Sequence, residues 1–501
     1  MTTSLTRLFP GPIRFLRLPV LLGLASCALA SALRAEAPLT LDEAIHLALG
    51  KNQQIKVQSF DQPIARANLL AAFGQFDPAL TFNRSYTETG TPASADPLVP
   101  QQVQSNAYGL AVAGTSPWGL IYSIGGNAQS ARTILGGTGS PQDYLSFGGI
   151  TITQPLLRGF GFGANLLGVR VAKANRAISD WQFRQTVIDT VTNVIYAFSN
   201  LALAQQQLRI AQRSHDLSAS LLDQNRKEFA VGNVSKNDIT QAKARVAATV
   251  ESILLAEQAV NDATNQLRQL IGETTFAVTP GPLAIDSPAL PELTLHPADD
   301  LREAYNLRPD YQQARLGLVK YRANEMATKN QLLPQVDFVG SYGYSGLDQS
   351  FAVSRRMVGD QENRSYSAGV VVSVPFTFAQ GRGNARSARL QLRQAEADLV
   401  RLEQDIAVSV AHAAGQIETA RRRVAADRTA YDLAQQVLDA EVKKYRAGTS
   451  STFLVLNYQD QLIGAENNLY VALAAQRSAL AFYDHEIGRT LERYQITLAK
   501  N

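Results

Sequence analysis

The chain has 501 residues, of which 45% are hydrophobic and 18% are charged, so it has enough apolar side chains for large cores and is not wholly disordered. Its 47 Lys and Arg against 43 Asp and Glu give a net charge of +4 without a long basic run, which argues against a nucleic-acid partner. One cysteine excludes a disulfide framework, and the five scattered histidines form no ligand motif, so we expect no metal, no cofactor and no catalytic residues.

The N-terminal segment 1–37 has the pattern of an export signal. Three arginines fall within the first 17 residues, and the apolar stretch from Leu18 to Leu33 is followed by small residues. That stretch is short for a membrane span, which favours a signal peptide over an anchor. Leu24-Ala25-Ser26-Cys27 also fits a lipobox, so acylation of Cys27 stays open as an alternative to its removal.

The rest of the chain repeats itself at long period. Phe229-Ala230-Val231-Gly232 aligns with Tyr445-Arg446-Ala447-Gly448, and Leu270-Ile271-Gly272 aligns with Glu486-Ile487-Gly488 at the same offset. We predict a first repeat at 38–272, a linker at 273–297, a second repeat at 298–488 and a polar periplasmic tail at 489–501.

Each repeat begins with segments that alternate between apolar and polar residues, at about 78–155 and 334–375. Period-two stretches of about ten residues, rich in tyrosine and separated by Gly, Ser and Asp, are typical of outer-membrane barrel strands. A water-soluble antiparallel sheet gives the same alternation. The export signal favours the membrane barrel over the water-soluble sheet.

Long helices follow the strands, as hairpins at 164–272 and 385–488. From 164 to 230 there is no proline and one glycine, and apolar residues recur every three or four positions. Such a stripe predicts a coiled-coil seam along a helix of about 100 Å. An ordinary long coiled coil has the same pattern, so the predicted strands are what distinguish this chain from a simple coiled-coil protein.

One chain offers four to six strands, whereas a membrane barrel needs about eight or more and tolerates no open edge in lipid. The barrel is therefore expected to be shared between chains, with the helical hairpins forming a tube beneath it.

Several motifs, in this order, resemble the TolC family of outer membrane efflux proteins over residues 39–490. The resemblance implies a homotrimer in the Gram-negative outer membrane, with a shared β-barrel in the lipid and a long α-helical barrel in the periplasm. It also implies docking with a periplasmic adaptor protein and an inner-membrane pump, either proton-driven or of the ABC type. The motifs are Leu39-Thr40-Leu41-Asp42-Glu43-Ala44, Gln154-Pro155-Leu156-Leu157-Arg158-Gly159, Leu333-Pro334-Gln335-Val336, Ser373-Val374-Pro375-Phe376 and the turns at Gly232 and Gly448.

The passages from strand to helix contain proline and glycine. Proline cannot donate to a strand ladder, so Pro155 and Pro375 are expected to end strands. The glycines after them resemble a dinucleotide-binding loop, but no βαβ unit follows, and hinges explain both halves. The expected hinge residues are Pro155, Gly159, Gly161, Gly163, Pro375, Gly381 and Gly383.

The hairpin tips lie far from the strands, because each turn glycine ends a long helix. The family resemblance implies that an adaptor contacts these tips, although simple turn residues would look the same. The implied contact residues are Gly232, Asn233, Val234, Ser235, Gly448, Thr449, Ser450 and Ser451.

The same tips are implied to close the pore. Asp238 matches a family aspartate that rings the aperture, but the second half has Leu454 there and Asn457 where another family aspartate lies. We therefore expect a more apolar constriction and weaker block by multivalent cations. Tyr445 matches a family tyrosine that holds the tips together by hydrogen bonds between helices.

The first half carries extra residues between its strand ends, since Pro78 to Pro155 spans 77 residues and Pro334 to Pro375 spans 41. The extra segment, within 88–142, includes two alternating stretches around Pro117-Trp118-Gly119. It is either an added membrane hairpin, giving six strands per chain and 18 in a trimer, or an extracellular hairpin above a 12-stranded barrel. We favour the second interpretation.

The function expected from these features is a passive exit duct of a tripartite efflux or type I secretion system, opened at its tips by the adaptor. We expect no enzyme activity, because the chain has no Walker loop and no catalytic cluster. A surface-exposed structural or adhesive coiled-coil protein is the alternative. The substrate and the class of pump cannot be read from the sequence.

Overall fold

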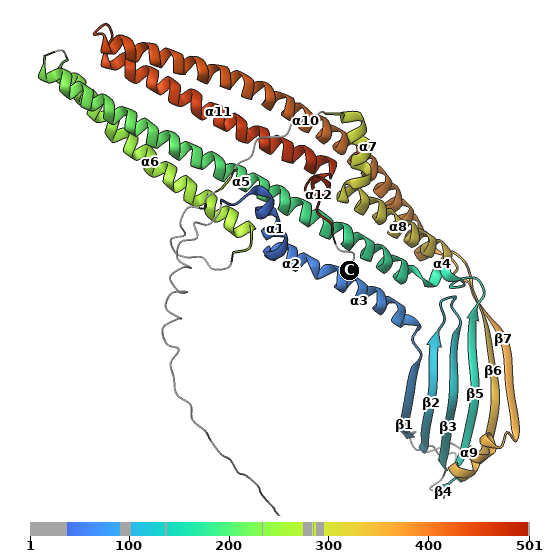
Figure 1. Cartoon of the computed structure of the whole chain (residues 1–501). Helices are drawn as coiled ribbons and strands as arrows, with labels where there is room; N and C mark the ends of the chain where they lie inside the picture. The colour runs from blue at the N-terminus through green and yellow to red at the C-terminus, as the bar shows by residue number, and fades with distance from the viewer. Residues whose placement is uncertain are drawn as a thin grey trace, which may run out of the picture.

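The computed structural model describes residues 38–90, 102–135, 138–232, 234–273, 283, 285–286 and 295–498. The predicted signal peptide with Cys27, the tip residue Asn233 and most of the linker 273–297 lie outside the described residues. The chain is elongated, with a β-sheet at one end and two long helical hairpins reaching away from it (Figure 1).

Helices make up most of the structure. Those of the first half are α1 (Leu41–Lys51), α2 (Gln53–Ser59), α3 (Asp61–Phe73), α4 (Phe162–Asn165), α5 (Leu167–Ala230) and α6 (Lys236–Leu270), with a 3₁₀ turn at Gly74–Phe76. Those of the second half are α7 (Pro297–Leu307), α8 (Pro309–Asn330), α9 (Phe351–Gly359), α10 (Ala379–Arg446), α11 (Thr452–Ile487) and α12 (Thr490–Arg493). Both long hairpins fall where the heptad pattern predicts them.

The main core lies along the middle of α5. Val187, Val191, Val194, Phe198 and Leu201 are fully buried at spacings of three or four, so they form one stripe on this 64-residue helix. Helices α1 and α6 and the chain end after Gly488 pack against it, through partners that include Ile45, Leu267 and Leu491. The segment after Gly488 therefore packs on the core. The sequence predicts only a polar tail here and not this packing.

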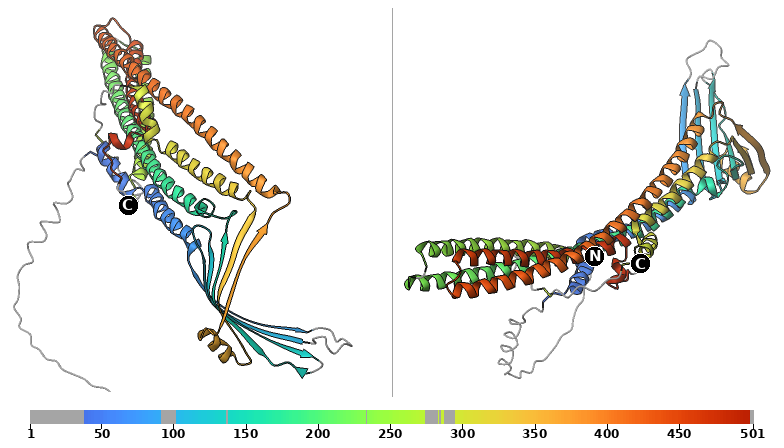
Figure 2. Two further views of the ribbon diagram at one scale, coloured as in Figure 1. Left: turned by 90° about the vertical axis from the view of Figure 1, so that its right-hand side faces the viewer. Right: turned by 90° about the horizontal axis from the view of Figure 1, so that it is seen from above.

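Among the described helices, α5 alone is long enough and apolar enough to cross a membrane, judged only by length and composition. Because 67% of its most apolar window is buried by the rest of the chain, it is a core helix. A second core joins α7, α10 and α11 around Ala413, Ile417, Tyr483 and Ile487. The two hairpins lie side by side, and α11 packs on α5 (Figure 2).

The sheet is antiparallel throughout, in the order β1-β2-β3-β5-β6-β7, with the short β4 paired to β3. The strands are β1 (Ala79–Gly90), β2 (Gln102–Thr115), β3 (Ile121–Leu135), β4 (Thr138–Gly139), β5 (Asp143–Pro155), β6 (Gln335–Asp348) and β7 (Asn363–Ser373). The chain therefore has six long strands in one continuous sheet.

The added hairpin is β2–β3, and its position corrects the interpretation favoured from the sequence. β2 pairs with β1 along the whole of β1, from Ala79 to Gly90, and β3 pairs with β5 over eleven residues. Both strands of the hairpin therefore belong to the sheet. Its turn at Pro117–Gly119 lies at the helical end, where the Gly161 amide donates to the Trp118 carbonyl at 3.0 Å. A hairpin standing outside a four-stranded sheet is excluded.

The sheet has one apolar and one polar face. Leu80, Val112, Ile124, Ile150 and Tyr342 lie opposite one another across five strands, so they share a face. The adjoining positions Thr81, Ser123, Thr151 and Ser341 lie on the other face. The two edge strands, β1 and β7, each have one side without a strand partner among the described residues.

The strand-to-helix passages agree only in part with the expected hinges. Pro155 is the last residue of β5, and Pro375 follows β7 by two residues. Gly159 and Gly161 have φ of +84° and +87°, which favours glycine.

The remaining three glycines have no positive φ, and their role as hinges stays a prediction. Gly163 lies within α4, and Gly381 and Gly383 lie within the first turns of α10. Between β7 and α10 the residue with a left-handed backbone is Phe378, with φ +47°, directly before α10.

Candidate functional site

The tip turns depend on glycine for a backbone reason. Gly232 and Gly448 have φ of +79° and +74°, and a Cβ at either position would meet nothing within 4 Å. The left-handed backbone, and not lack of space, therefore favours glycine. After Gly448, the Thr449 amide donates to the Lys444 carbonyl at 3.0 Å and completes the helix end.

The returning helices begin with side-chain caps. Ser235 caps α6, and its hydroxyl and amide both donate to the Asp238 carboxylate, at 2.6 and 2.9 Å. Ser451 caps α11 by accepting from the Leu454 amide at 3.4 Å. The half-buried Asp238 is thus engaged at the start of its own helix, and its role in a pore ring stays a prediction.

A buried polar triad joins the two hairpins just inside the tips. The Tyr445 hydroxyl on α10 donates to Asn225 Oδ1 on α5 at 2.5 Å, and Asn225 Nδ2 donates to Thr452 Oγ1 on α11 at 3.2 Å. Asn225 and Thr452 are almost fully buried, and Leu221 and Val455 pack beside them. Buried side-chain bonds of this kind fix one packing of three helices.

The other two predicted gate residues, Leu454 and Asn457, lie on the exposed side of the first turns of α11. Leu454 is 37% exposed and Asn457 is exposed, whereas their neighbours Thr452 and Val455 are buried. Leu454 and Asn457 therefore face away from the triad, and their role in a gate stays a prediction.

Two ion pairs reinforce the contact between hairpins. Arg213 on α5 binds Glu466 on α11 at 2.9 Å, and Arg245 on α6 binds Asp460 on α11. At the second tip, Glu441 accepts from the Ser450 hydroxyl at 2.5 Å and from Lys444 at 3.2 Å, and these bonds lower the pKa of Glu441. Ser450 therefore has a bond within its own tip.

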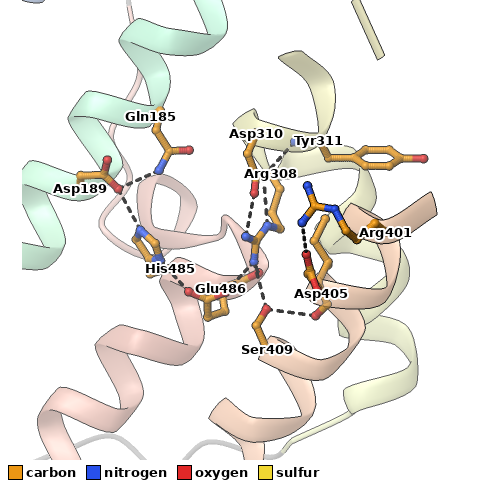
Figure 3. Close-up of polar contacts among 11 residues, drawn as sticks. Gln185, Asp189, Arg308, Asp310, Tyr311, Arg401, Asp405, Ser409, His485 and Glu486 are labelled. Carbon is orange, nitrogen blue, oxygen red and sulfur yellow. Dashed lines mark hydrogen bonds and ion pairs between the residues drawn. The ribbon is translucent and has the colours of Figure 1, made fainter. Parts of the chain in front are cut away.

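A second polar cluster, the mid-chain ion network, lies near the bases of the hairpins (Figure 3). It consists of Asp189 on α5, Arg308 and Asp310 at the start of α8, and His485 and Glu486 at the end of α11. Arg308 reaches Asp310 at 2.8 Å and Glu486 at 2.6 Å, while His485 reaches Asp189 at 2.8 Å and Glu486 at 3.1 Å.

Burial and ion pairing shift the pKa values of Glu486 and His485 in opposite directions. Burial alone would raise the pKa of Glu486, but hydrogen bonds from His485 and Arg308 lower it to about 2. Burial alone would lower the pKa of His485, but its bonds to Asp189 and Glu486 raise it to about 9. Both groups are therefore charged at neutral pH, and the network holds α5, α8 and α11 together.

Sequence reasoning did not identify Asn225, Thr452 or the mid-chain network. Asn225 lies on the apolar stripe of α5, and a polar residue on such a stripe is the one local signal for the triad. The network has no such signal, because Asp189, Arg308 and Glu486 are far apart in the chain. Among the described residues no cluster of three or more His, Cys, Asp or Glu is placed to hold a metal ion.

Comparison with known proteins agrees with this arrangement. The family model "Outer membrane efflux protein" matches residues 44–273 and 301–482. Outer membrane efflux protein BepC of Brucella suis biovar 1 is 23% identical over 326 residues, 65% of this chain and 68% of BepC. Alkaline protease secretion protein AprF of Pseudomonas aeruginosa is 23% identical over 335 residues, 66% of each chain. The chain thus spans about two thirds of the length of these relatives.

The fold agrees with that of a solved channel. The Campylobacter jejuni CmeC outer membrane channel superposes with a TM-score of 0.67 at 14% identity, covering 90% of this chain and 86% of that one. The matched proteins are channel and transport proteins. The chain is an outer-membrane protein with a long periplasmic helical extension. Its resemblance to efflux channels is confirmed: it belongs to the outer membrane efflux protein family.

Proposed function

We propose that three copies of the chain join edge to edge, β1 of one against β7 of the next, into a shared barrel of 18 strands. The observation that carries this proposal is the sheet itself, whose two edge strands have no outer partner among the described residues and which has one apolar and one polar face. Lipid tolerates neither an open edge nor an unpaired backbone, so such a sheet requires closure by other copies. The apolar face then contacts lipid and the polar face lines water.

The trimer is a passive exit duct. The helical hairpins continue the barrel as a tube into the periplasm, and transport energy comes from an inner-membrane pump. The names of BepC and AprF support a conduit for efflux or for protein secretion. A periplasmic adaptor docks at the turns 232–235 and 448–451, because the hairpin tips α5–α6 and α10–α11 lie farthest from the sheet (Figure 1).

The gate of the duct is a choice between two packings of the hairpins. In the closed packing, the Tyr445–Asn225–Thr452 triad and the Arg213 and Arg245 ion pairs keep the hairpins together. Leu454 and Asn457, exposed on α11, meet their copies around the axis and narrow the opening. Adaptor docking favours the packing in which these bonds are broken.

The test is made on the purified, full-length chain in detergent and in planar lipid bilayers. We expect the mass of a trimer by light scattering, stepwise ionic conductance on insertion, and 18 strands around the pore by electron cryo-microscopy. A monomer without conductance would contradict the duct and favour the adhesive alternative. A conducting trimer with 12 strands would contradict only the place given to β2–β3.

A further inference from the structure

Helix α9 lies on the apolar face of the sheet, at the end away from the long helices (Figures 1 and 2). Its Ser354 is fully buried, and the hydroxyl bonds to Ser146 Oγ and to the Gly346 carbonyl, both at 2.8 Å. A Cβ at Gly346 would lie 2.2 Å from the Ser354 carbonyl oxygen, so the close contact requires glycine. Arg84, Tyr108, Ser146 and Gly346 follow one line across the strands and share this face.

Aromatic rings connect α9 to the strands beside it. The Phe351 ring centroid lies 5.8 Å from those of Tyr108 and of Tyr144. The Arg84 guanidinium is 5.5 Å from the Tyr108 ring centroid, so a cation stacks on the aromatic cluster at its edge. Tyrosines above an aliphatic band, here Leu80 and Ile150, are typical of the level where a membrane meets water.

This end of the apolar face is rich in arginine. Arg355 and Arg356 are exposed on α9, and Arg84, Arg132 and Arg364 are exposed on the strands at alternate positions that share this face. In the part of the chain that the structure describes, none of the five forms an ion pair.

The nearby acids have other donors. Glu88 accepts from the Tyr86 hydroxyl and from Gln102, and Asp348 accepts from the Ser350 amide at 2.7 Å. The exposed Asp360 and Glu362, in the turn from α9 to β7, add negative charge there, and in the described part of the chain neither forms an ion pair with these arginines. Hydrogen bonds from these neutral donors leave the carboxylate charges in place, so the five arginines exceed the four acids Glu88, Asp348, Asp360 and Glu362 by one positive charge.

We propose that this arginine surface binds the phosphate groups of an anionic glycolipid in the outer leaflet, with α9 lying at the level of the lipid headgroups. The orientation rests on the duct proposed above, in which the apolar face meets lipid and the helices lie in the periplasm. Guanidinium groups bind phosphate in a bidentate manner, and the aromatic cluster beside them suits the boundary between headgroup and acyl chain. Charge complementarity favours a phosphorylated lipid over a neutral one or a second protein.

The test measures lipid bound by the purified trimer. The trimer is reconstituted in nanodiscs of zwitterionic lipid with lipid A carrying two phosphates or with its dephosphorylated form, and bound lipid is counted by native mass spectrometry. We expect preference for the phosphorylated form, and a loss of about tenfold in R355Q/R356Q, since each arginine contributes charge-assisted hydrogen bonds. The control R393Q/R428Q removes two exposed arginines of α10 and should bind as the unmodified chain does.

A second variant addresses the helix itself. Gly346→Val should displace α9 from the sheet and lose the lipid while the trimer remains. Equal retention of the two lipid forms, or equal binding by R355Q/R356Q and its control, would overturn the proposal. Competition by millimolar inorganic phosphate alone would show a simple anion site and would also overturn it. Conductance of the same preparations separates the two ideas, because failure of the duct abolishes conductance and failure of the lipid surface leaves it intact.

Discussion

The Tyr445 hydroxyl donates to the side-chain oxygen of Asn225 at 2.5 Å, which joins two helices whose residues are 220 positions apart. Both residues are buried, and Thr452 closes the triad from a third helix. A hydrogen bond inside a low-dielectric contact is difficult to replace by water, so it holds one packing of the hairpins. The bond lies one helical turn from the Gly448 tip.

Tyr445→Phe is expected to favour the open packing. A buried hydrogen bond contributes about 1 kcal/mol net, so its loss should raise the open fraction about fivefold. Open probability in planar bilayers measures this. Tyr458→Phe, which removes a hydroxyl near the same apolar cluster, is the matched control and should leave the open fraction unchanged. Equal behaviour of the two variants would remove Tyr445 from the gate.

Leu454→Asp is expected to make the channel sensitive to multivalent cations. Three copies would place three carboxylates around the axis, where their fields add, whereas the natural leucine has no charge. Block by hexaamminecobalt(III) from the periplasmic side should strengthen by at least about tenfold, and the uncharged Leu454→Asn serves as control. An unmodified channel already blocked as strongly as L454D would show that the constriction is not apolar.

Glu486→Gln is expected to destabilise the chain at the mid-chain network. Its side chain is 10% exposed and pairs with Arg308, which is 14% exposed, so neutralising it leaves a buried cation with fewer partners. Breaking such a pair costs about 3–5 kcal/mol. Glu418→Gln removes the half-exposed partner of Arg422 and should cost less than about 1 kcal/mol. Melting temperatures of the two trimers in detergent give the comparison, and similar values would mean that the network is not stabilising.

Stability should also fall at alkaline pH through His485. Folding raises its pKa from 6.5 to about 9, by the bonds to Asp189 and Glu486, so protonation stabilises the folded chain. This contribution is fully present below pH 6.5 and is lost as the pH rises through about 9. Melting temperatures between pH 6 and about pH 10 should therefore decline less in His485→Gln.

Two partners in the network keep their charge over that range. Bonds from His485 and Arg308 lower the pKa of Glu486 to about 2, and bonds to Asp310 and Glu486 raise the pKa of Arg308 although burial opposes this. His412→Gln is the control, because His412 is exposed and bonds to Gln416 within its own helix. Parallel decline in H485Q and the unmodified chain would place the pH effect elsewhere.

Much of the fold could be predicted because it depends on short-range pattern. The stripe of α5 and the glycines at 232 and 448 determine where the helices run and turn, since helical period and positive φ act within a few residues. The alternation of Leu80, Phe82 and Tyr86 likewise shows in a single strand. Gly381 and Gly383 lie in the first turns of α10 without a positive φ, so the glycine pattern alone did not show whether the chain turns there.

The gate stays a prediction, and the structure adds the local contacts of its residues. Tyr445 lies in a bond between helices, whereas its partner Asn225 carried no distinguishing motif. Asp238 proved to cap its own helix, a local use that the spacing of Ser235 and Asp238 already permits.

The sequence by itself determined the long elements: where the two helical hairpins run and turn, and which segments alternate as strands. Only the tertiary structure decided that β2–β3 belongs to the sheet, that α9 lies on its apolar face, and that Asp189, Arg308 and Glu486 meet. Period and backbone restriction are properties of neighbouring residues, whereas strand order and buried ion pairs depend on which distant surfaces exclude water from each other.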